Sequence, residues 1–283
     1  MQVASPATLE AMKGPEGDVH VVSAADDPAL APFRQLKDAT QRNLGNFIVE
    51  SERVLERMIE LGTAIEAVLV TPSRWDRIAA TVATAHGVDG PPQVIIADPA
   101  VVDEAIGFAL HRGVVAIARR PSPLNPVEAL SSARRVVVLE DVVDPDNVGS
   151  VFRHAAAFGA DLVVLSEHAG DPLFRKAVRT SMGWVLDVPW TRVAAADELV
   201  PTLHRAGFTT IALTPSGDVG IEDVLLPRSP EARVAVLLGS ETDGLRAPTL
   251  SAASRRVRIQ IADHVDSLNV ATAAAIAMFS LFR

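Results

Sequence analysis

The C-terminal part of the chain constrains the fold most strongly, because apolar runs alternate there with polar, glycine-containing loops. The run at residues 233–238 is typical of a buried strand, and the turn 239–245 follows it. A second strand is predicted at 257–261, and a helix that begins near Ser267, a good N-cap residue, closes the chain. In α/β proteins, ligands bind beyond the carboxyl ends of the strands. Two loops and one helix N-terminus are therefore expected to converge on a small polar molecule.

Length and composition indicate a protein with two α/β domains. A chain of 283 residues with 48% hydrophobic content is long enough for two ordinary cores. The sequence contains no cysteine, which excludes disulfides and thiolate metal sites. We find neither a signal peptide nor an apolar stretch that could span a bilayer. The expectation is a cytoplasmic protein without a membrane partner.

The formal net charge of −9 argues, taken as an average, against a nucleic-acid partner. All but three of the 26 basic residues are arginine, however, and arginine offers planar, multi-donor contacts to phosphate. They cluster at 119–120, 134–135, 175–179 and 255–258. Each cluster is consistent either with contacts to RNA or with salt bridges on a solvated surface.

Short apolar runs that alternate with helical periodicity predict a small α/β domain over residues 19–120. It follows a loose tail over residues 1–18, and three prolines mark a linker over 121–133. The second domain is predicted over 134–283.

Local signals predict several helix boundaries. A helix is expected over 28–39, and Ser73 is expected to cap a helix that runs to His86. In the second domain, Asn147 is expected near the N-cap of a helix that ends at Phe158, and the alternation of elements continues with an apolar segment at 184–188.

Three ordered motifs carry a resemblance to a known family. They are Asn-Val-Gly-Ser-Val-Phe-Arg at 147–153, Gly-Ser-Glu at 239–241 with Gly244-Leu245, and Ser-Leu-Asn-Val-Ala at 267–271. Together they resemble the motifs of the SpoU (TrmH) branch of the SPOUT methyltransferases. The resemblance implies an enzyme that transfers a methyl group from S-adenosylmethionine to a ribose 2′-hydroxyl of RNA, with rRNA a more natural substrate than tRNA.

The resemblance also implies roles for five polar residues. Arg153 matches an arginine proposed to act in catalysis, and Asn147 matches a residue that supports it. Glu241 is expected to brace the site, and Ser267 and Asn269 to complete it. Because a guanidinium is effectively always protonated, Arg153 is easier to understand as a stabiliser of the forming alkoxide than as a base, but both roles stay open.

The cofactor is expected to lie against backbone groups of the C-terminal loops. By the resemblance, Gly239, Ile259 and Leu268 hold the adenine end of S-adenosylmethionine, Ile261 belongs to the same wall, and Thr214 flanks the pocket. The family usually has Ile-Pro-Met where this chain has Ile259-Gln-Ile261. Since the expected contacts are main-chain ones, they survive the change.

The resemblance extends to architecture. Family members have a Rossmann-like parallel sheet whose C-terminal segment forms a trefoil knot, pair as homodimers through the methyltransferase domain, and often carry an N-terminal domain that resembles a ribosomal protein and binds RNA. The segment Phe47–Glu50 followed by Arg53 resembles the opening of that domain, although Ser51 stands where the family usually has glycine.

Other functional classes fit the sequence less well. The first strand of the second domain is not followed by the Gly-x-Gly-x-x-Gly of NAD-binding folds, and we find no Gly-x-Ser-x-Gly elbow of a serine hydrolase. No histidine or carboxylate pair stands at metal-ligand spacing, so no metal is expected. The alternative that remains is an RNA-binding protein that keeps the fold without catalysing methyl transfer.

Overall fold

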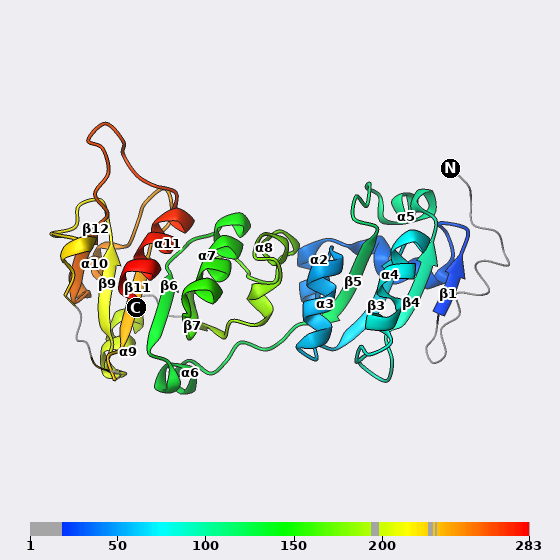
Figure 1. Cartoon of the computed structure of the whole chain (residues 1–283), viewed down its shortest axis with the longest axis horizontal. Helices are drawn as coiled ribbons and strands as arrows, with labels where there is room; N and C mark the ends of the chain where they lie inside the picture. The colour runs from blue at the N-terminus through cyan, green and yellow to red at the C-terminus, as the bar shows by residue number, and fades with distance from the viewer. Residues whose placement is uncertain (1–18, 194–197, 226–228, 230, 283) are drawn as a thin grey trace. The chain divides into compact units, whose positions relative to one another are not determined.

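The structure is a computed structural model that describes residues 19–193, 198–225, 229 and 231–282, so the predicted tail over 1–18 lies outside the described residues. The chain divides into two compact units (Figure 1). The first extends to Pro121 and includes Leu173–Arg179, and the second comprises Ser122–Pro172 and the chain from Thr180 onward.

The first unit is built on a five-stranded mixed sheet with the strand order β1-β4-β3-β5-β2. β1, β4 and β3 are parallel, whereas β5 runs antiparallel to both β3 and β2. Its elements are β1 (Val19–Val22), the 3₁₀ helix η1 (Pro28–Gln35), α2 (Asp38–Asn43), β2 (Asn46–Val49), α3 (Glu52–Glu60), β3 (Ile65–Val70), α4 (Pro72–Val82), β4 (Gln93–Ala97), α5 (Pro99–Ile106) and β5 (Val114–Arg119).

Prolines decide two helix boundaries that the sequence interpretation placed differently. The helix predicted over 28–39 is a 3₁₀ helix that contains Pro32, followed by the separate α2. Because proline lacks a backbone N–H, it interrupts a regular α-helix. The next difference is at α4, which begins at Pro72 with Thr71 as its N-cap, so the prediction of Ser73 as the cap was wrong. Proline suits the first helical turn, where its missing N–H would have no partner in any case.

The second unit is built on a seven-stranded sheet with the order β10-β12-β9-β11-β6-β7-β8, in which every neighbouring pair is parallel. Its elements are α6 (Pro126–Ser132), β6 (Arg135–Leu139), α7 (Pro145–Phe158), β7 (Leu162–Ser166), α8 (Arg175–Thr180, which spans the division between the units), η2 (Trp184–Leu186), β8 (Trp190–Val193), α9 (Leu199–Arg205), β9 (Thr209–Leu213), β10 (Val219–Gly220), η4 (Ile221–Asp223), β11 (Val234–Leu238), α10 (Ala247–Ala252), β12 (Arg255–Arg258) and α11 (Val270–Leu281).

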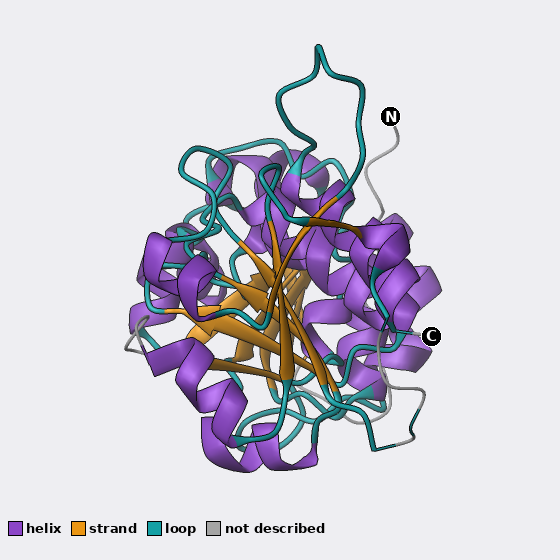
Figure 2. Ribbon diagram, turned by 90° about the vertical axis from the view of Figure 1, so that its left-hand side faces the viewer, coloured by secondary structure: helices purple, strands orange, loops and turns teal. Residues whose placement is uncertain are grey.

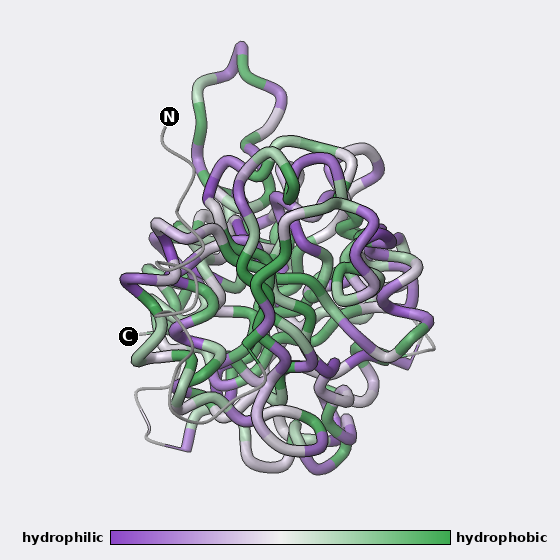
Figure 3. The backbone as a smooth tube through the Cα atoms, turned by 90° about the vertical axis from the view of Figure 1, so that its right-hand side faces the viewer, coloured by the Kyte–Doolittle hydropathy of each residue, from purple (hydrophilic) through white to green (hydrophobic). Residues whose placement is uncertain are grey.

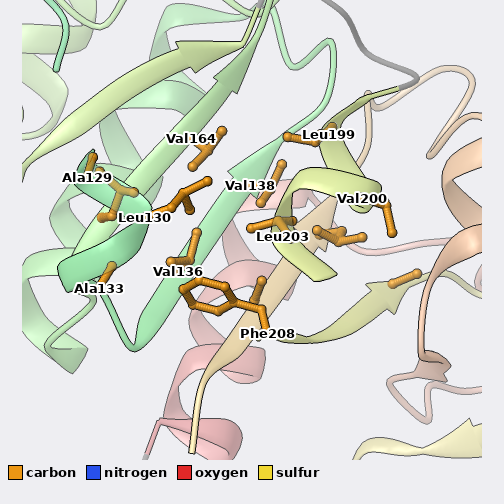
Figure 4. Packing of buried hydrophobic residues seen from close by; sticks show 14 of the residues in the cluster. Ala129, Leu130, Ala133, Val136, Val138, Val164, Leu199, Val200, Leu203 and Phe208 are labelled. Atoms are coloured by element: carbon orange, nitrogen blue, oxygen red, sulfur yellow. The ribbon is translucent and has the colours of Figure 1, made fainter. Parts of the chain in front are cut away.

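Alternating side chains of the central strands give this unit two packed faces. Val136, Val138 and Leu237 point into a cluster that includes Leu130 from α6 and Leu203 from α9 (Figure 4). In the hydropathy-coloured tube of the whole chain, apolar segments gather towards the middle of the view and many of the outer loops are polar (Figure 3). Continuous apolar runs of this kind are typical of parallel strands covered on both faces.

Several elements of the second unit lie where the sequence interpretation did not place them. The apolar segment at 184–188 begins with the short helix η2, and the strand follows at 190–193. The predicted linker over 121–133 contains α6, whose Ala129 and Leu130 are buried. The helix after β6 begins at Pro145 with Asp144 as its N-cap, so Asn147 lies within the first turn and is not the cap.

The carboxyl ends of β6, β9, β11 and β12 meet at one edge of the sheet, since these strands are parallel neighbours. Helices flank the strands, and a long loop between β12 and α11 projects from the edge (Figure 2). No helix among the described residues combines the length and the apolar character needed to cross a bilayer.

Candidate active site

A cavity of about 850 Å³ opens at the carboxyl edge of the second sheet. Its volume lies within the range typical of sites for small ligands, about 300–1,000 Å³. Three loops form its walls, after β9, after β11 and before α11. The lining residues comprise 213–216, 238–245, 250, 258–263, 265–270 and 273.

All five residues predicted to bind the cofactor line this cavity, namely Thr214, Gly239, Ile259, Ile261 and Leu268. β12 ends at Arg258, which is earlier than predicted, so both isoleucines belong to the loop and not to the strand. In the part of the chain that the structure describes, the amides of Ile259 and Leu268 donate no backbone hydrogen bond. A ligand can therefore use main-chain groups of this wall.

The backbone of the turn itself requires glycine at position 239. A Cβ atom at this position would lie 2.1 Å from the carbonyl carbon of Gly244 and 2.2 Å from the amide nitrogen of Leu245. The turn 239–245 thus closes on itself so tightly that only glycine fits at its start. The requirement arises from the protein's own backbone, before any ligand is considered.

A chain of side-chain hydrogen bonds joins three of the predicted site residues. The Asn147 side-chain amide donates to Glu241 Oε1, and the Asn269 amide donates to Asn147 Oδ1 over 2.8 Å. Asn147 is nearly buried, whereas Glu241 and Asn269 line the cavity. The three motifs therefore meet at one point, where α7, the loop after β11 and α11 come together.

Asn269 is also the N-cap of α11. Its Oδ1 accepts hydrogen bonds from the backbone amides of Ala271 and Thr272, at 3.0 and 3.2 Å. The prediction that Ser267 caps this helix was therefore wrong, because α11 begins at Val270. Ser267 is exposed and lines the cavity.

Arg153 is not brought into the cavity. It lies on α7 about 9 Å along the helix axis from Asn147 and on a different side of the helix. Its side chain is exposed, and within the described ranges it makes no hydrogen bond or ion pair. The structure thus presents Arg153 as a cation on the surface of α7.

His154, the next residue on α7, points about a quarter turn away from Arg153 and is half-buried. Burial lowers the pKa of His154 below its ordinary value of 6.5, a backbone hydrogen bond at Ala271 offsets part of this effect, and the charge of Arg153 adds to the lowering. Its Nδ1 atom is buried without a hydrogen-bond partner among the described residues. Burial therefore favours the neutral ring.

The sequence interpretation missed a group of polar residues that support the cavity from behind. Glu140 is fully buried and accepts hydrogen bonds from the Arg246 backbone amide at 2.9 Å and the Thr249 hydroxyl at 2.6 Å. The Arg246 guanidinium binds Asp141. A carboxylate at the end of an apolar strand was the available signal, since a buried charge requires partners nearby.

Four of the arginines in the predicted clusters take part in local ion pairs. Arg134 lies 3.6 Å from Glu231, and Arg135 lies 3.4 Å from Asp161. Arg175 lies 2.7 Å from Glu50, and Arg256 lies 2.9 Å from Asp218. Their charges are partly neutralised, which lowers their value for binding phosphate.

Comparison with known proteins agrees with the three motifs. Residues 134–279 match the model of the SpoU rRNA Methylase family. The chain is 39% identical over 275 residues to an uncharacterized tRNA/rRNA methyltransferase of Mycobacterium bovis, covering 95% of this chain and 94% of the relative. It is 27% identical to the 23S rRNA (guanosine-2′-O-)-methyltransferase RlmB of a Burkholderia species, over 81% of this chain and 93% of the relative.

A solved structure extends the similarity to the whole fold. The AdoMet-bound rRNA methyltransferase of Sinorhizobium meliloti superimposes with a TM-score of 0.78 at 26% identity, covering 93% of this chain and 97% of that protein. The similarity therefore includes the first unit as well as the second. The chain belongs to the SpoU rRNA methylase family, as its sequence motifs predict.

Proposed function

We propose that this protein transfers a methyl group from S-adenosylmethionine to a ribose 2′-hydroxyl of RNA. The observation that carries the proposal is the hydrogen-bonded chain Asn269–Asn147–Glu241 at the border of the 850 Å³ cavity. The residues expected to bind the cofactor and the three hydrogen-bonded polar side chains lie next to each other there. Methyl transfer requires this proximity, because donor and acceptor must be held together.

The cavity suits S-adenosylmethionine in charge as well as in size. Four carboxylate residues line it (Glu241, Asp243, Asp263 and Asp266), with Arg258 as the single lining arginine or lysine among the described residues. When bound, S-adenosylmethionine supplies an electrophilic methyl group on a positively charged sulfur. An acidic lining favours such a cation. The main-chain groups of Gly239, Ile259 and Leu268, which line the cavity, would hold its adenine end.

The polar chain would orient the acceptor. Glu241 accepts the hydrogen bond of Asn147 and fixes that amide, while Asn269 holds Asn147 from the other side. With its amide oriented in this way, Asn147 can direct the ribose, and Ser267 adds a hydroxyl at the rim of the cavity. Such preorganised groups contribute to catalysis because they need no rearrangement during the reaction.

Arg153 would act from the RNA side. Its guanidinium stays protonated and can therefore stabilise negative charge on the ribose oxygen and a neighbouring phosphate. Because it is exposed on α7 and does not line the cavity, it acts on RNA that lies along the surface of α7.

We infer that the substrate is rRNA in preference to tRNA and that the protein works in the cytoplasm. The family name and the named activity of RlmB support the rRNA assignment. We further infer that the predicted N-terminal domain, residues 19–120, which makes up most of the first unit, binds RNA. Arg119, exposed at the end of β5, supports this, since the hydrogen bonds that its guanidinium makes to the Leu44 carbonyl and the Asn46 side chain are long, at 3.4 Å.

We also infer a homodimer through the methyltransferase domain. The helix α11, Val270–Leu281, consists almost entirely of apolar residues, yet Phe279 on it is 54% exposed. Phe279 packs edge-on against Phe158 of α7, with ring centroids 6.0 Å apart. A helix that is apolar all round is normally buried, so a second copy covering α7 and α11 would account for this surface. Light scattering of Phe279→Glu should then show a monomer where the wild type shows a dimer.

The activity is tested with radiolabelled S-adenosylmethionine and purified total rRNA and total tRNA. The expected product is label in rRNA whose position resists alkaline hydrolysis, since a 2′-O-methyl group removes the nucleophile of strand cleavage. If the labelled methyl group is found on a base and not on a ribose, the protein is a base methyltransferase and the proposal is wrong. Binding of RNA without any transfer of label would favour the non-catalytic alternative.

A further inference from the structure

Asp141 follows β6 directly and adopts a backbone conformation that few residues use. Its φ is +57°, and Met182 is the other non-glycine residue with positive φ in the part of the chain that the structure describes. Aspartate tolerates the left-handed region better than most residues, but the conformation persists only where the surroundings hold it.

Two partners hold Asp141. Its backbone amide donates to Ser166 Oγ at 2.9 Å, and the same hydroxyl donates back to Asp141 Oδ1 at 2.8 Å. Arg246 donates two hydrogen bonds to Asp141 Oδ2, from Nε at 2.9 Å and from Nη2 at 2.6 Å. The carboxylate is thus fixed on one side by β7 and on the other by the residue that follows the cavity loop.

Glu140, immediately before it, holds both ends of that loop. Its backbone amide donates to the carbonyl of Leu238 at 2.8 Å, and its Oε2 accepts from the Arg246 amide at 2.9 Å. Leu238 precedes Gly239, and Arg246 follows Leu245, so one buried residue defines the distance that the loop 239–245 must span.

Most of the loop has little support from packing, because residues 241–244 are exposed and Leu245, at its end, is the residue of the loop that is buried in the core. Residues 240–244 line the 850 Å³ cavity and also a second cavity of about 280 Å³, whose other lining residues are Asp141, Val143 and Arg246. A segment that borders a cavity on each side depends on its anchored ends for its position. Those ends are held by Glu140 and by the Asp141–Arg246 pair.

We propose that Asp141 and Arg246 are positioning residues for methyl transfer, which together with Glu140 fix the cofactor loop 239–245 relative to the segment that leads to Asn147. Asp141 belongs to that segment, and Arg246 belongs to the end of the loop. The pair therefore sets the separation between Glu241 and the helix that carries Asn147. This inference rests on the proposed function, because it concerns the geometry of the same site.

A purely structural role predicts a different outcome. The Asp141 and Arg246 side chains are 25% and 40% exposed, and a partly solvated ion pair of this kind contributes little to folding stability. If the pair only stabilised the fold, removing it would lower the fraction of folded protein and leave the rate per folded molecule unchanged. A positioning role predicts that the fraction of folded protein stays the same and that the rate per folded molecule falls.

Asp141→Asn is the informative variant, because asparagine has the same shape, tolerates the left-handed conformation and can still bond to Ser166. It loses the charge that binds Arg246. Asp218→Asn is a matched control, since Asp218 makes a similar pair with Arg256, at 2.9 and 3.0 Å, and neither residue lines a cavity. The variants are compared by thermal unfolding, by calorimetric titration with S-adenosylmethionine, and by single-turnover transfer to rRNA with both substrates saturating.

We expect Asp141→Asn to unfold close to the wild-type temperature and to transfer methyl groups at least about tenfold more slowly, since a small misplacement of reacting groups has large effects on rate. Arg246→Lys, which keeps the charge without the two-donor contact, should recover only part of the rate. Asp218→Asn should match the wild type throughout. A wild-type single-turnover rate in Asp141→Asn, or a loss that merely follows the fraction of protein that binds cofactor, would overturn the proposal.

Amide hydrogen exchange separates this proposal from the proposed function. Even if the wild type methylated none of the RNAs offered, faster exchange of the amides at 239–246 in Asp141→Asn than in Asp218→Asn would support the anchoring of the loop. Equal exchange in both variants would overturn it regardless of activity.

Discussion

Asn269 donates a hydrogen bond of 2.8 Å to Asn147, and the same side chain caps α11 through Ala271 and Thr272. Its amide nitrogen donates to Asn147 in the site, while its amide oxygen accepts the hydrogen bonds that cap the helix. Asn269 therefore couples the start of α11 to the first turn of α7, although the two asparagines lie far apart in the sequence. Both functions of the side chain can be tested separately.

Asn269→Asp should separate the capping of α11 from the hydrogen bond to Asn147. A carboxylate can still accept hydrogen bonds from Ala271 and Thr272, and negative charge is favourable at a helix N-terminus, so the unfolding temperature should stay near that of the wild type. The donor to Asn147 is lost, however, and single-turnover methylation should fall by about tenfold or more. Asn269→Ala should lose the same activity and also about 1 kcal/mol of stability. Undiminished methylation in Asn269→Asp would show that the bond to Asn147 is dispensable.

Arg153→Ala should lower single-turnover methylation by about a hundredfold or more, roughly 2.7 kcal/mol of barrier, and leave the affinity for S-adenosylmethionine nearly unchanged. The reason is that Arg153 lies outside the cavity lining and is proposed to meet the RNA. Arg153→Lys should recover little, because a single ammonium cannot reproduce the planar contact. Calorimetry and rapid-quench transfer assays measure the two quantities. A near wild-type rate in Arg153→Ala would leave Arg153 as a solvated helix residue.

Gly239→Ala should weaken binding of S-adenosylmethionine at least tenfold, which corresponds to about 1.4 kcal/mol. The added Cβ would lie 2.1 to 2.3 Å from the backbone of Gly244 and Leu245, so the loop must open. Gly62→Ala is the control, because Gly62 lies outside the cavity and a Cβ there meets nothing within 4 Å, so any strain from its positive φ of +68° does not reach the loop. Calorimetry should show unchanged affinity for the control. The same affinity in a folded Gly239→Ala protein would remove the cofactor from this loop.

Removal of an RNA-binding arginine should reduce the dependence of RNA affinity on salt. Arg119→Gln should lower the slope of log affinity against log salt by about 0.7–0.9, the value expected for one lost phosphate contact. Arg134→Gln is the matched control, since Arg134 already faces Glu231 at 3.6 Å and should change the slope less. Filter binding to rRNA fragments over a range of salt concentrations measures both slopes. Equal slopes for Arg119→Gln and the wild type would place the RNA surface elsewhere.

His154 should make folding stability depend on pH in a defined direction. Its pKa in the folded protein lies below the ordinary value of 6.5, so the unfolded chain binds more protons between the two values. The stabilisation is therefore complete above about pH 6.5 and is lost as the pH falls through the folded pKa. Urea unfolding at several pH values should show a smaller loss on acidification for His154→Gln than for the wild type. Identical losses in the two proteins would mean that the pKa of His154 is the same in the folded and the unfolded chain.

Much of the fold could be predicted because its strands are short continuous apolar runs. The run predicted at 233–238 carries no competing signal, and β11, Val234–Leu238, begins one residue later and ends at the predicted residue. The family prediction is confirmed by the match of residues 134–279 to the family model. The second motif follows β11 directly, whereas the first lies on α7 and the third spans the start of α11. The apolar residues of 184–188 show no clear strand pattern. In the structure, residues 184–186 form a 3₁₀ helix, which local sequence alone does not predict.

The site was less predictable where it depends on contacts between distant residues. Ser267 and Asn269 are both good N-cap residues, and local propensity cannot choose between them. Asn269 makes the additional bond to Asn147, which no local pattern contains. Likewise, the buried position of Glu140 becomes visible only when Arg246 and Thr249 are seen beside it.

Two of the three loops that form the walls of the cavity differ in how freely their length can change. Glu140 binds Leu238 on one side and Arg246 on the other, so an inserted residue between them would break one of these bonds or bulge into a cavity. The loop 259–269 has no such cross-tie among the described residues, and its single internal backbone bond joins Val265 to Ala262. Insertions and deletions should therefore be tolerated in the loop before α11, where they can reshape the mouth of the pocket while Glu241 and Asn147 keep their distance.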